Sequence, residues 1–292
     1  MATLRAAGIL TIFVAVTVLL IPVQWLALRL HSGWARNFPH VYHRFVCRLI
    51  GVRITVLGKP ATGGVLMTAN HTGWLDVPIL SAVAPVSFVA KQEVGTWRFF
   101  GTLARLQRTI FIRRGERTKA LEDRDNIRRR LLAGDTLVIF PEGTSTDGNR
   151  VLSFKSALLS AAELPLGQDE RQREIHPPVQ PVSVAYVGLH GLPMGRENRP
   201  FFAWYGDMEL VPHLWEAFEM GPIDVVVELH KPLTVDEAGG RKQLAAAAEA
   251  AVRGGVVRAL SGAHADPPPP PHQDEELLEA LQDDETDTEE AA

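Results

Sequence analysis

The chain begins with a long apolar run. No residue from Ala6 to Leu28 carries a charge, and as a helix this run would measure about 34 Å, enough to cross a hydrocarbon core. Pro22 and Gln24 interrupt its C-terminal end. Three interpretations stay open: a transmembrane helix, a helix lying in one leaflet, and a signal peptide. The third is the weakest, because no small-residue cleavage site follows.

Helical and strand-like patterns alternate along the rest of the chain. Strands that alternate with helices indicate an α/β fold, with a mixed, largely parallel sheet flanked by helices. The hydrophobic periodicity predicts helices over 35–51, 75–83, 96–106, 117–134, 154–162 and 241–259, and strands over 52–58, 64–70, 86–91, 109–114, 136–140, 179–186 and 223–233.

Charge divides the chain unevenly. The last 27 residues, from Asp266, hold eleven acidic residues and no Lys or Arg, so 1–265, with 23 acidic and 30 basic residues, carries +7. A basic body suits a membrane surface, a phosphorylated substrate or nucleic acid, although a solvated surface explains it equally well. The single cysteine, Cys47, cannot form an internal disulfide,.

These patterns divide the chain into three parts. Between Arg29 and Arg53 there are five arginines and no acidic residue, a bias that favours the cytoplasmic side of a membrane. We expect residues 1–50 to form a membrane anchor and a basic interfacial helix, and 51–260 to form the α/β domain. Residues 261–292 are Pro-rich and then acidic, which predicts a disordered tail.

The first candidate site follows the strand predicted at 64–70, where Asn70 and His71 precede Asp76. Ligands bind beyond the carboxyl ends of strands in open α/β sheets. A histidine there can take a proton from a hydroxyl, and a carboxylate can orient the ring. Without a nearby Gly-x-Ser-x-Gly or cysteine, the histidine would act on a substrate hydroxyl directly. Alternatively, Asp76 caps the next helix and His71 is an ordinary polar residue.

Two further stretches carry polar groups at strand ends. In 140–148, "FPEGTSTDG", Gly143 permits a positive φ that can turn backbone N–H groups toward an anion, and Glu142 is expected to bond the backbone or a substrate hydroxyl,. An ordinary turn explains this stretch as well. After "TIFI", at most one of Arg113 and Arg114 can address the site, where it would hold a phosphate or carboxylate. Otherwise they belong to a basic loop facing the membrane.

Together and in this order, these elements resemble the motifs of the glycerolipid acyltransferase family, of which bacterial 1-acyl-glycerol-3-phosphate acyltransferases are typical. Its Asn-His-x₄-Asp motif corresponds to 70–76, Phe-Ile-x-Arg to 111–114, Phe-Pro-Glu-Gly-Thr to 140–144, and Val-x-Pro-Val to 179–182. The likeness covers roughly 50–235, and four ordered motifs are far more specific than one.

The resemblance implies roles for these residues. His71 would be the base that activates the acceptor hydroxyl, and Asp76 would orient it. The acyl donor would be an acyl carrier protein or coenzyme A thioester, with the oxyanion held by backbone N–H groups. No metal, bound cofactor or nucleic acid is implied. The implied acceptor-binding residues are Asn70, Arg113, Arg114, Glu142, Gly143, Thr144 and Ser145.

The sequence also departs from the family pattern. The family often has Ser where Gly73 stands and Gly where Arg108 stands. Phosphatidate-forming members usually have Arg where Ser145 stands, so one phosphate-binding charge is missing. Either Arg113 or Lys155 replaces it, or the acceptor head group differs. The stretches 140–159 and 203–214 look like the branch that acylates lyso-ornithine lipid.

The expected activity is therefore a membrane-bound O-acyltransferase acting on a lyso-lipid hydroxyl, with 51–260 as the acyltransferase domain. The default acceptor is 1-acyl-sn-glycerol-3-phosphate, which gives phosphatidate, and lyso-ornithine lipid is the alternative. The expected location is the cytoplasmic face of a bacterial-type inner membrane. Two other classes stay open: a non-catalytic lipid-binding protein of the same fold, and a lipid hydrolase that uses the same pair with water.

Overall fold

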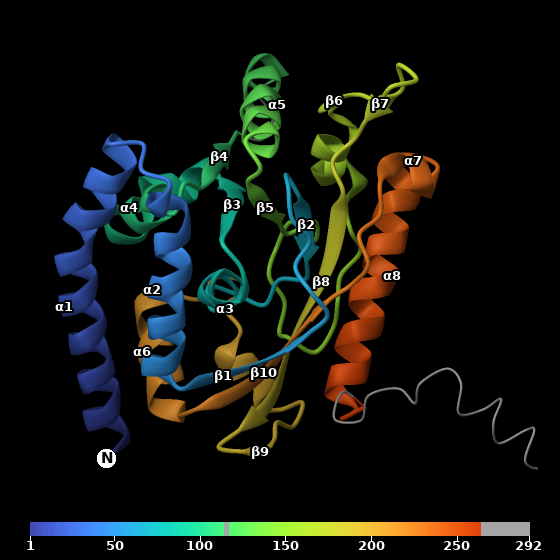
Figure 1. Cartoon of the computed structure of the whole chain (residues 1–292). Coiled ribbons are helices and arrows are strands. Elements are labelled where there is room, and N and C mark those ends of the chain that lie inside the picture. Colours follow the sequence, from blue (N-terminus) through green and yellow to red (C-terminus); the bar gives the residue numbers. More distant parts are fainter. Residues whose placement is uncertain (114–116, 264–292) are drawn as a thin grey trace, which may run out of the picture.

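A mixed β-sheet forms the centre of the molecule (Figure 1). The computed structural model describes residues 1–113 and 117–263. The strands of the main sheet lie in the order β1-β10-β8-β2-β5-β3-β4, with β9 paired to β8. Their bounds are β1 Val52–Leu57, β2 Leu66–Ala69, β3 Val86–Lys91, β4 Ile110–Ile112, β5 Thr136–Ile139, β8 Val179–Leu189, β9 Leu192–Pro193 and β10 Ile223–Leu229.

The sheet is largely parallel, as the alternating pattern predicted. β8, β2, β5, β3 and β4 run parallel to one another, whereas β10 is antiparallel to β8 and parallel to β1. The carboxyl ends of β2, β5, β3 and β4 therefore share one edge of the sheet, where ligands bind in folds of this type.

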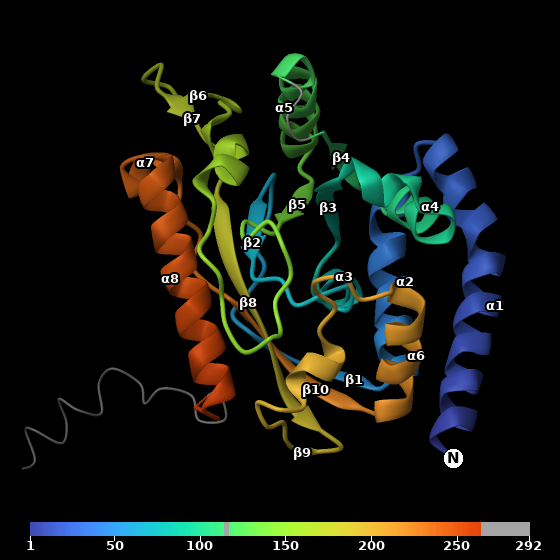
Figure 2. The ribbon, with the colours of Figure 1, turned by 180° about the vertical axis from the view of Figure 1, so that it is seen from behind.

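Helices cover both faces of the sheet (Figures 1 and 2). On one side lie α1, α2, α3 and α6, and on the other lie α5, α8 and the 3₁₀ helix 156–163. The helices are α1 Ala2–Arg29, α2 Trp34–Ile50, α3 Asp76–Val83, α4 Arg98–Leu106, α5 Arg117–Leu132, α6 Leu210–Met220, α7 Val235–Ala238 and α8 Arg241–Leu260.

A separate hydrophobic core lies on each face of the sheet. Successive strand residues point to opposite faces, so Met67 and Val138 pack toward α2 and α3, whereas Leu66 and Leu137 pack toward α5 and α8. All four side chains are buried. This explains why these short strands are uninterrupted apolar runs without a polar face.

The N-terminal helix is a packed part of the molecule. α1 lies against α2, α4 and α6, and its two ends are fastened by side chains. Arg5 donates hydrogen bonds to Phe218 O and Ile50 O, at 2.8 and 2.9 Å, and Gln24 donates to Ala35 O and Leu106 O, both at 2.9 Å. The opposite side of α1 exposes a stripe of large apolar residues: Ile12, Val14, Val18, Leu19, Val23, Trp25 and Leu26.

Most predicted elements are present, with shifted ends. The apolar helix runs over 2–29, and the strand expected at 223–233 ends at Leu229. The stretch 154–162, expected as an ordinary helix, contains a 3₁₀ helix, Ser156–Glu163. Four features were not predicted from the sequence: α6, α7, β9 and the small hairpin of β6 Gly167–Gln168 and β7 Glu174–Ile175. From residue 264 onward the predicted tail lies outside the described residues.

A buried aspartate joins two helices and the turn that follows α4. Asp135, 2% exposed, accepts from Arg36 of α2 at 2.9 Å, from Arg108 at 2.7 Å, and from Arg130 of α5. Arg108 has φ +64°, a conformation that favours glycine, which accounts for the glycine that the family often has there. In this chain the ion pair with Asp135 helps to hold the arginine in that conformation.

We predict that Asp135→Asn lowers the melting temperature by about 6–12 °C. Arg108 and Arg130 would lose their carboxylate in a largely buried position, which typically costs roughly 3 kcal/mol. Thermal unfolding in detergent measures this. Asp224→Asn, which breaks the more exposed pair with Arg53, is the matched control and should change the melting temperature little. Equal shifts for both variants would contradict the prediction.

Candidate active site

The histidine predicted at the end of β2 lies where the chain leaves the sheet. Asn70 ends the strand: its side chain donates to Val184 O at 2.9 Å and accepts from Val184 N–H at 2.8 Å. The amide thus joins β2 to β8 and is 4% exposed. The structure therefore places Asn70 between the strands, away from an acceptor, while His71 turns out of the ladder.

His71 and Asp76 form the predicted pair. The Nδ1 atom of His71 lies 2.8 Å from Oδ2 of Asp76. Because a carboxylate only accepts, Nδ1 carries the proton of the neutral ring, which leaves Nε2 as the basic nitrogen. The His71 side chain is 24% exposed, whereas that of Asp76 is fully buried. The arrangement therefore presents a base to the site and keeps its carboxylate away from solvent.

Asp76 does not cap its own helix, which was the alternative from the sequence. Its Oδ2 instead accepts the backbone N–H groups of Thr72 and Gly73, at 2.6 and 3.0 Å. Its Oδ1 accepts the hydroxyl of Tyr186 at 2.8 Å. Burial, followed by the charge of Asp76, raises the pKa of Tyr186 well above its usual value, so the hydroxyl is a neutral donor. Four donors thus fix one buried carboxylate.

The loop after β5 supports the backbone of His71 on both sides. The Oε1 atom of Glu142 accepts the His71 N–H at 3.2 Å, and Thr146 donates its backbone N–H to His71 O at 2.9 Å. The ring of His71 stacks on Phe140, with centroids 4.0 Å apart. The third sequence motif therefore positions the first, by contacts that the sequence spacing could not reveal.

Glu142 was predicted to bind the acceptor, but it lies beneath the site. Its side chain is 1% exposed. Burial raises its pKa to about 8, opposed by hydrogen bonds from the backbone of His71 and Leu152. Glu142 thus has the first of the two roles considered from the sequence, which was to bond the backbone.

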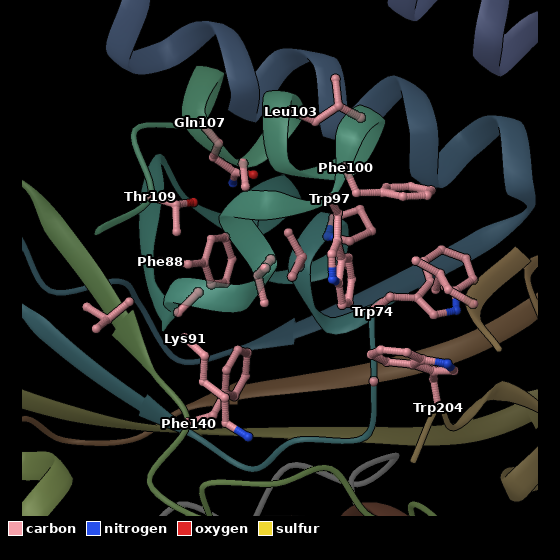
Figure 3. A pocket seen from close by; sticks show the side chains of 18 of the residues that line it. Trp74, Phe88, Lys91, Trp97, Phe100, Leu103, Gln107, Thr109, Phe140 and Trp204 are labelled. Carbon is pink, nitrogen blue, oxygen red and sulfur yellow. The ribbon is translucent and has the colours of Figure 1, made fainter. Parts of the chain in front are cut away.

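A cavity of ≈ 1050 Å³ opens beside His71 (Figure 3). Its walls are largely apolar and come from α1, α2, α4, β3 and the loop before α6. Figure 3 labels Phe88, Phe100, Leu103 and Phe140 among the lining side chains. The cavity is also lined by three residues predicted to bind the acceptor, Gly143, Thr144 and Ser145. A pocket of this size and polarity suits a lipid chain.

The basic residues considered for binding the acceptor lie in different places. Arg113 lines the cavity at the end of β4, together with Lys91 at the end of β3. Arg114 lies outside the described residues. Lys155 is exposed, and a Cβ added at Gly143 would lie 3.0 Å from its Nζ, so its ammonium group lies over the Glu-Gly-Thr turn. Gly143 has φ +75°, as predicted.

The described residues offer no evident metal site. Across 1–113 and 117–263, no three His, Cys, Asp or Glu side chains are grouped closely enough to hold a metal ion. Tyr186 was missed by sequence reasoning, and the stretch 203–214 was singled out only for its likeness to one branch of the family, without a place at the cavity. The strand pattern placed Tyr186 in the sheet, but nothing in it indicated that the hydroxyl meets Asp76.

Known proteins resemble this chain in sequence and in fold. The Acyltransferase family model matches residues 53–185. A lyso-ornithine lipid O-acyltransferase of Brucella abortus is 45% identical over 261 residues, which cover 89% of this chain and 97% of that protein. The chain belongs to this acyltransferase family. A second lyso-ornithine lipid O-acyltransferase, from Rhizobium meliloti, is 41% identical over 80% of this chain and 79% of that protein.

A solved structure has the same fold as this acyltransferase. The 1-acyl-sn-glycerophosphate acyltransferase PlsC of Thermotoga maritima superposes with a TM-score of 0.61 at 21% identity, over 88% of this chain and 97% of that chain. The predicted family, the α/β fold and the acyltransferase class are thus confirmed.

We predict that Glu142→Gln becomes progressively more stable than the wild type as pH rises. A glutamate with a pKa of about 8 when folded and 4.5 when unfolded keeps a proton that the unfolded chain has lost between these values. Its contribution to stability is thus complete below pH 4.5 and lost as pH rises through 8. Glutamine keeps the acceptor oxygen and does not titrate.

Melting temperatures at pH 5 and pH 8.5 measure this. The difference between variant and wild type should grow by at least about 5 °C in favour of the variant. Glu219→Gln, on α6, is the control and should show no such trend. A constant difference across this range would contradict the assignment of a buried, protonated Glu142.

Proposed function

We propose that this acyltransferase is a lyso-ornithine lipid O-acyltransferase that works at the cytoplasmic face of the inner membrane. Two relatives that match most of its length, at 45% and 41% identity, are named for that reaction. Ser145 stands where phosphatidate-forming members have an arginine, which also favours an acceptor other than lysophosphatidate. The contact of His71 with Asp76 at the edge of an apolar cavity carries the proposal.

The chemistry begins at Nε2 of His71. This nitrogen takes the proton of the acceptor hydroxyl while the hydroxyl oxygen attacks the thioester carbonyl carbon. The oxyanion then collapses, the carbon–sulfur bond breaks, and the imidazolium returns its proton to the departing thiolate. Asp76 keeps Nδ1 protonated and stabilises the imidazolium. The products are an ester and a free thiol.

The donor is proposed to be an acyl carrier protein or coenzyme A thioester, with its acyl chain in the apolar cavity. The backbone N–H groups of Thr144 and Ser145 are candidates for holding the oxyanion. Both residues line the cavity, and within the described chain neither N–H donates a hydrogen bond. Such donors stabilise an acyl-transfer transition state because charge develops on the carbonyl oxygen.

The packing of α1 supports a position of this helix in one leaflet. Arg5 and Gln24 fasten both ends of this helix to the folded domain. A helix that crossed the bilayer would therefore draw polar parts of the domain into the hydrocarbon. We propose that α1 lies in one leaflet, with its exposed apolar stripe in the lipid and its other side lining the cavity. An acyl chain then passes from bilayer to cavity without crossing water.

We predict that His71→Ala lowers acyl transfer by at least ~10²-fold, because it removes the base. Purified protein is given labelled acyl thioester and a panel of lyso-lipids, and the product is identified by mass. His190→Asn, on an exposed turn where φ is +54°, is the control, because asparagine tolerates positive φ.

Three outcomes separate the function classes. Transfer that persists at the wild-type rate in His71→Ala would reject His71 as the base, whereas a wild type that binds lyso-lipid without transferring or consuming the thioester would be a lipid-binding protein. Thioester consumed without esterified product would indicate a hydrolase. Transfer to lysophosphatidate in preference to lyso-ornithine lipid would restore the default acceptor.

We predict that Asp76 contributes more to the reaction rate than Tyr186, which donates a hydrogen bond to it. Asp76→Asn should reduce kcat by ~10²-fold or more, because an amide cannot fix the tautomer of His71. Tyr186→Phe leaves the carboxylate in place and should cost only ~10-fold, the value of one lost hydrogen bond to a charged group. Steady-state kinetics measures kcat and KM of both variants. We expect a larger loss of kcat for Asp76→Asn than for Tyr186→Phe, with KM unchanged in both. A larger loss for Tyr186→Phe would contradict it.

A further inference from the structure

A loop between the 3₁₀ helix Arg199–Phe202 and α6 covers part of the cavity. We call residues 203–208 the 203–208 loop. Its base is fixed, because Phe202 and Ala203 are buried. Four of its residues line the cavity that contains His71: Trp204, Tyr205, Gly206 and Asp207.

The loop is held by the two motif loops that form the site. The Trp204 N–H donates to Thr72 O at 3.0 Å, next to His71. The Ser145 hydroxyl donates to Trp204 O at 2.6 Å, from the Glu-Gly-Thr turn. The backbone of Trp204 thus lies between the first and third motifs, and any change in either would move the loop.

Gly73 makes this close approach possible. A Cβ at this position would come within 2.7 Å of Trp204 N and 3.0 Å of its Cβ, closer than ordinary packing permits. The glycine is therefore required by the neighbouring chain, since its own φ is not positive. A serine at residue 73 would push the backbone of Trp204 away.

Aromatic packing holds the far side of the loop. The indole N–H of Trp204 donates to Met208 O at 2.8 Å, which closes the loop on itself. Its ring meets Trp97 edge to face, with centroids 5.8 Å apart. Figure 3 shows Trp74, Trp97 and Trp204 gathered on one side of the cavity. The loop is therefore a fixed wall of the site.

Gly73 departs from the general family pattern and Ser145 departs from the pattern of the phosphatidate-forming members, and both residues contact Trp204. An arginine at residue 145 would lose the bond to Trp204 O and would need the volume that the loop occupies. Neither departure acts alone. Together they make room for the 203–208 loop and fasten it.

The loop brings a carboxylate to the cavity. Asp207 is exposed, lines the cavity, and among the described residues has no Lys, Arg or His within 4.0 Å. An ornithine head group carries a carboxylate and a side-chain ammonium, whereas a phosphate monoester carries only negative charge. A free carboxylate attracts the first and repels the second, which is how charge produces specificity.

We propose that the 203–208 loop, seated by Gly73 and Ser145, selects the acceptor head group, and that Asp207 binds its ammonium. This inference rests on the proposed function and names the specificity element of the same site. Asp207 and Ser145 act on the choice of acceptor, whereas His71 and Asp76 act on the reaction.

The test compares three acceptors: lyso-ornithine lipid, its side-chain N-acetylated analogue, which lacks the positive charge, and lysophosphatidate. Values of kcat/KM are measured in mixed micelles for the wild type, Asp207→Asn, Ser145→Ala and Ser145→Arg. Glu209→Gln removes a nearby charge that does not line the cavity and is the control. Thermal unfolding verifies that each variant is folded.

We expect Asp207→Asn to lose ~10-fold with lyso-ornithine lipid and to act unchanged on the N-acetylated analogue, because one charged contact is removed. Ser145→Arg should lower the ratio of lyso-ornithine lipid to lysophosphatidate turnover by ~10-fold or more, with Ser145→Ala between it and the wild type. Glu209→Gln should leave all three rates unchanged.

The two proposals fail in different ways. A wild type that acylates lysophosphatidate but not lyso-ornithine lipid would overturn the proposed function, together with the inference that rests on it. Two results would overturn the inference alone, if the wild type prefers lyso-ornithine lipid. In one, Asp207→Asn affects both ornithine acceptors equally. In the other, Ser145→Arg leaves the ratio of lyso-ornithine lipid to lysophosphatidate turnover unchanged. Because Asp207 is exposed, its variant keeps the test valid even where Ser145→Arg destabilises the fold.

Discussion

The site depends on one buried carboxylate. Asp76 has no contact with solvent, so its charge is stable only if donors surround it. Two backbone N–H groups, the Tyr186 hydroxyl and the ring of His71 supply them. The loop after β2, strand β8 and the start of α3 therefore meet at a single side chain. This constraint fixes the imidazole at the sheet edge, and the other elements of the site are arranged around it.

The N-terminal apolar helix and the catalytic domain form one unit. α1 was expected as part of a separate anchor over 1–50, yet its residues line the same cavity as His71. Thr17 even shares a hydrogen bond of 2.6 Å with Tyr42 of α2 inside this interface. In the proposed membrane position, anchoring and substrate access would be two consequences of the same packing, because α1 borders the cavity beside His71.

The sequence revealed what is local. The apolar runs predicted the strands. The spacing of His71 and Asp76 permitted a pair but left a helix cap open, and the resemblance to the family favoured the pair. The sequence could not reveal contacts between distant segments. Glu142 and Asn70 were assigned to the acceptor, whereas the fold uses them to fasten the backbone of His71 and strand β8. The helix α6 and the position of Trp204 depend on tertiary packing, which the hydrophobic periodicity of the sequence does not reveal.

The polar contact of Gln24 with Ala35 and Leu106 has a practical consequence. Protein chemists often remove an N-terminal apolar helix to obtain a more soluble enzyme. Here that deletion would remove one wall of the cavity beside His71 and expose the aromatic residues of α4 to water. A shortened protein is therefore expected to aggregate, and its inactivity would say nothing about the chemistry of the histidine.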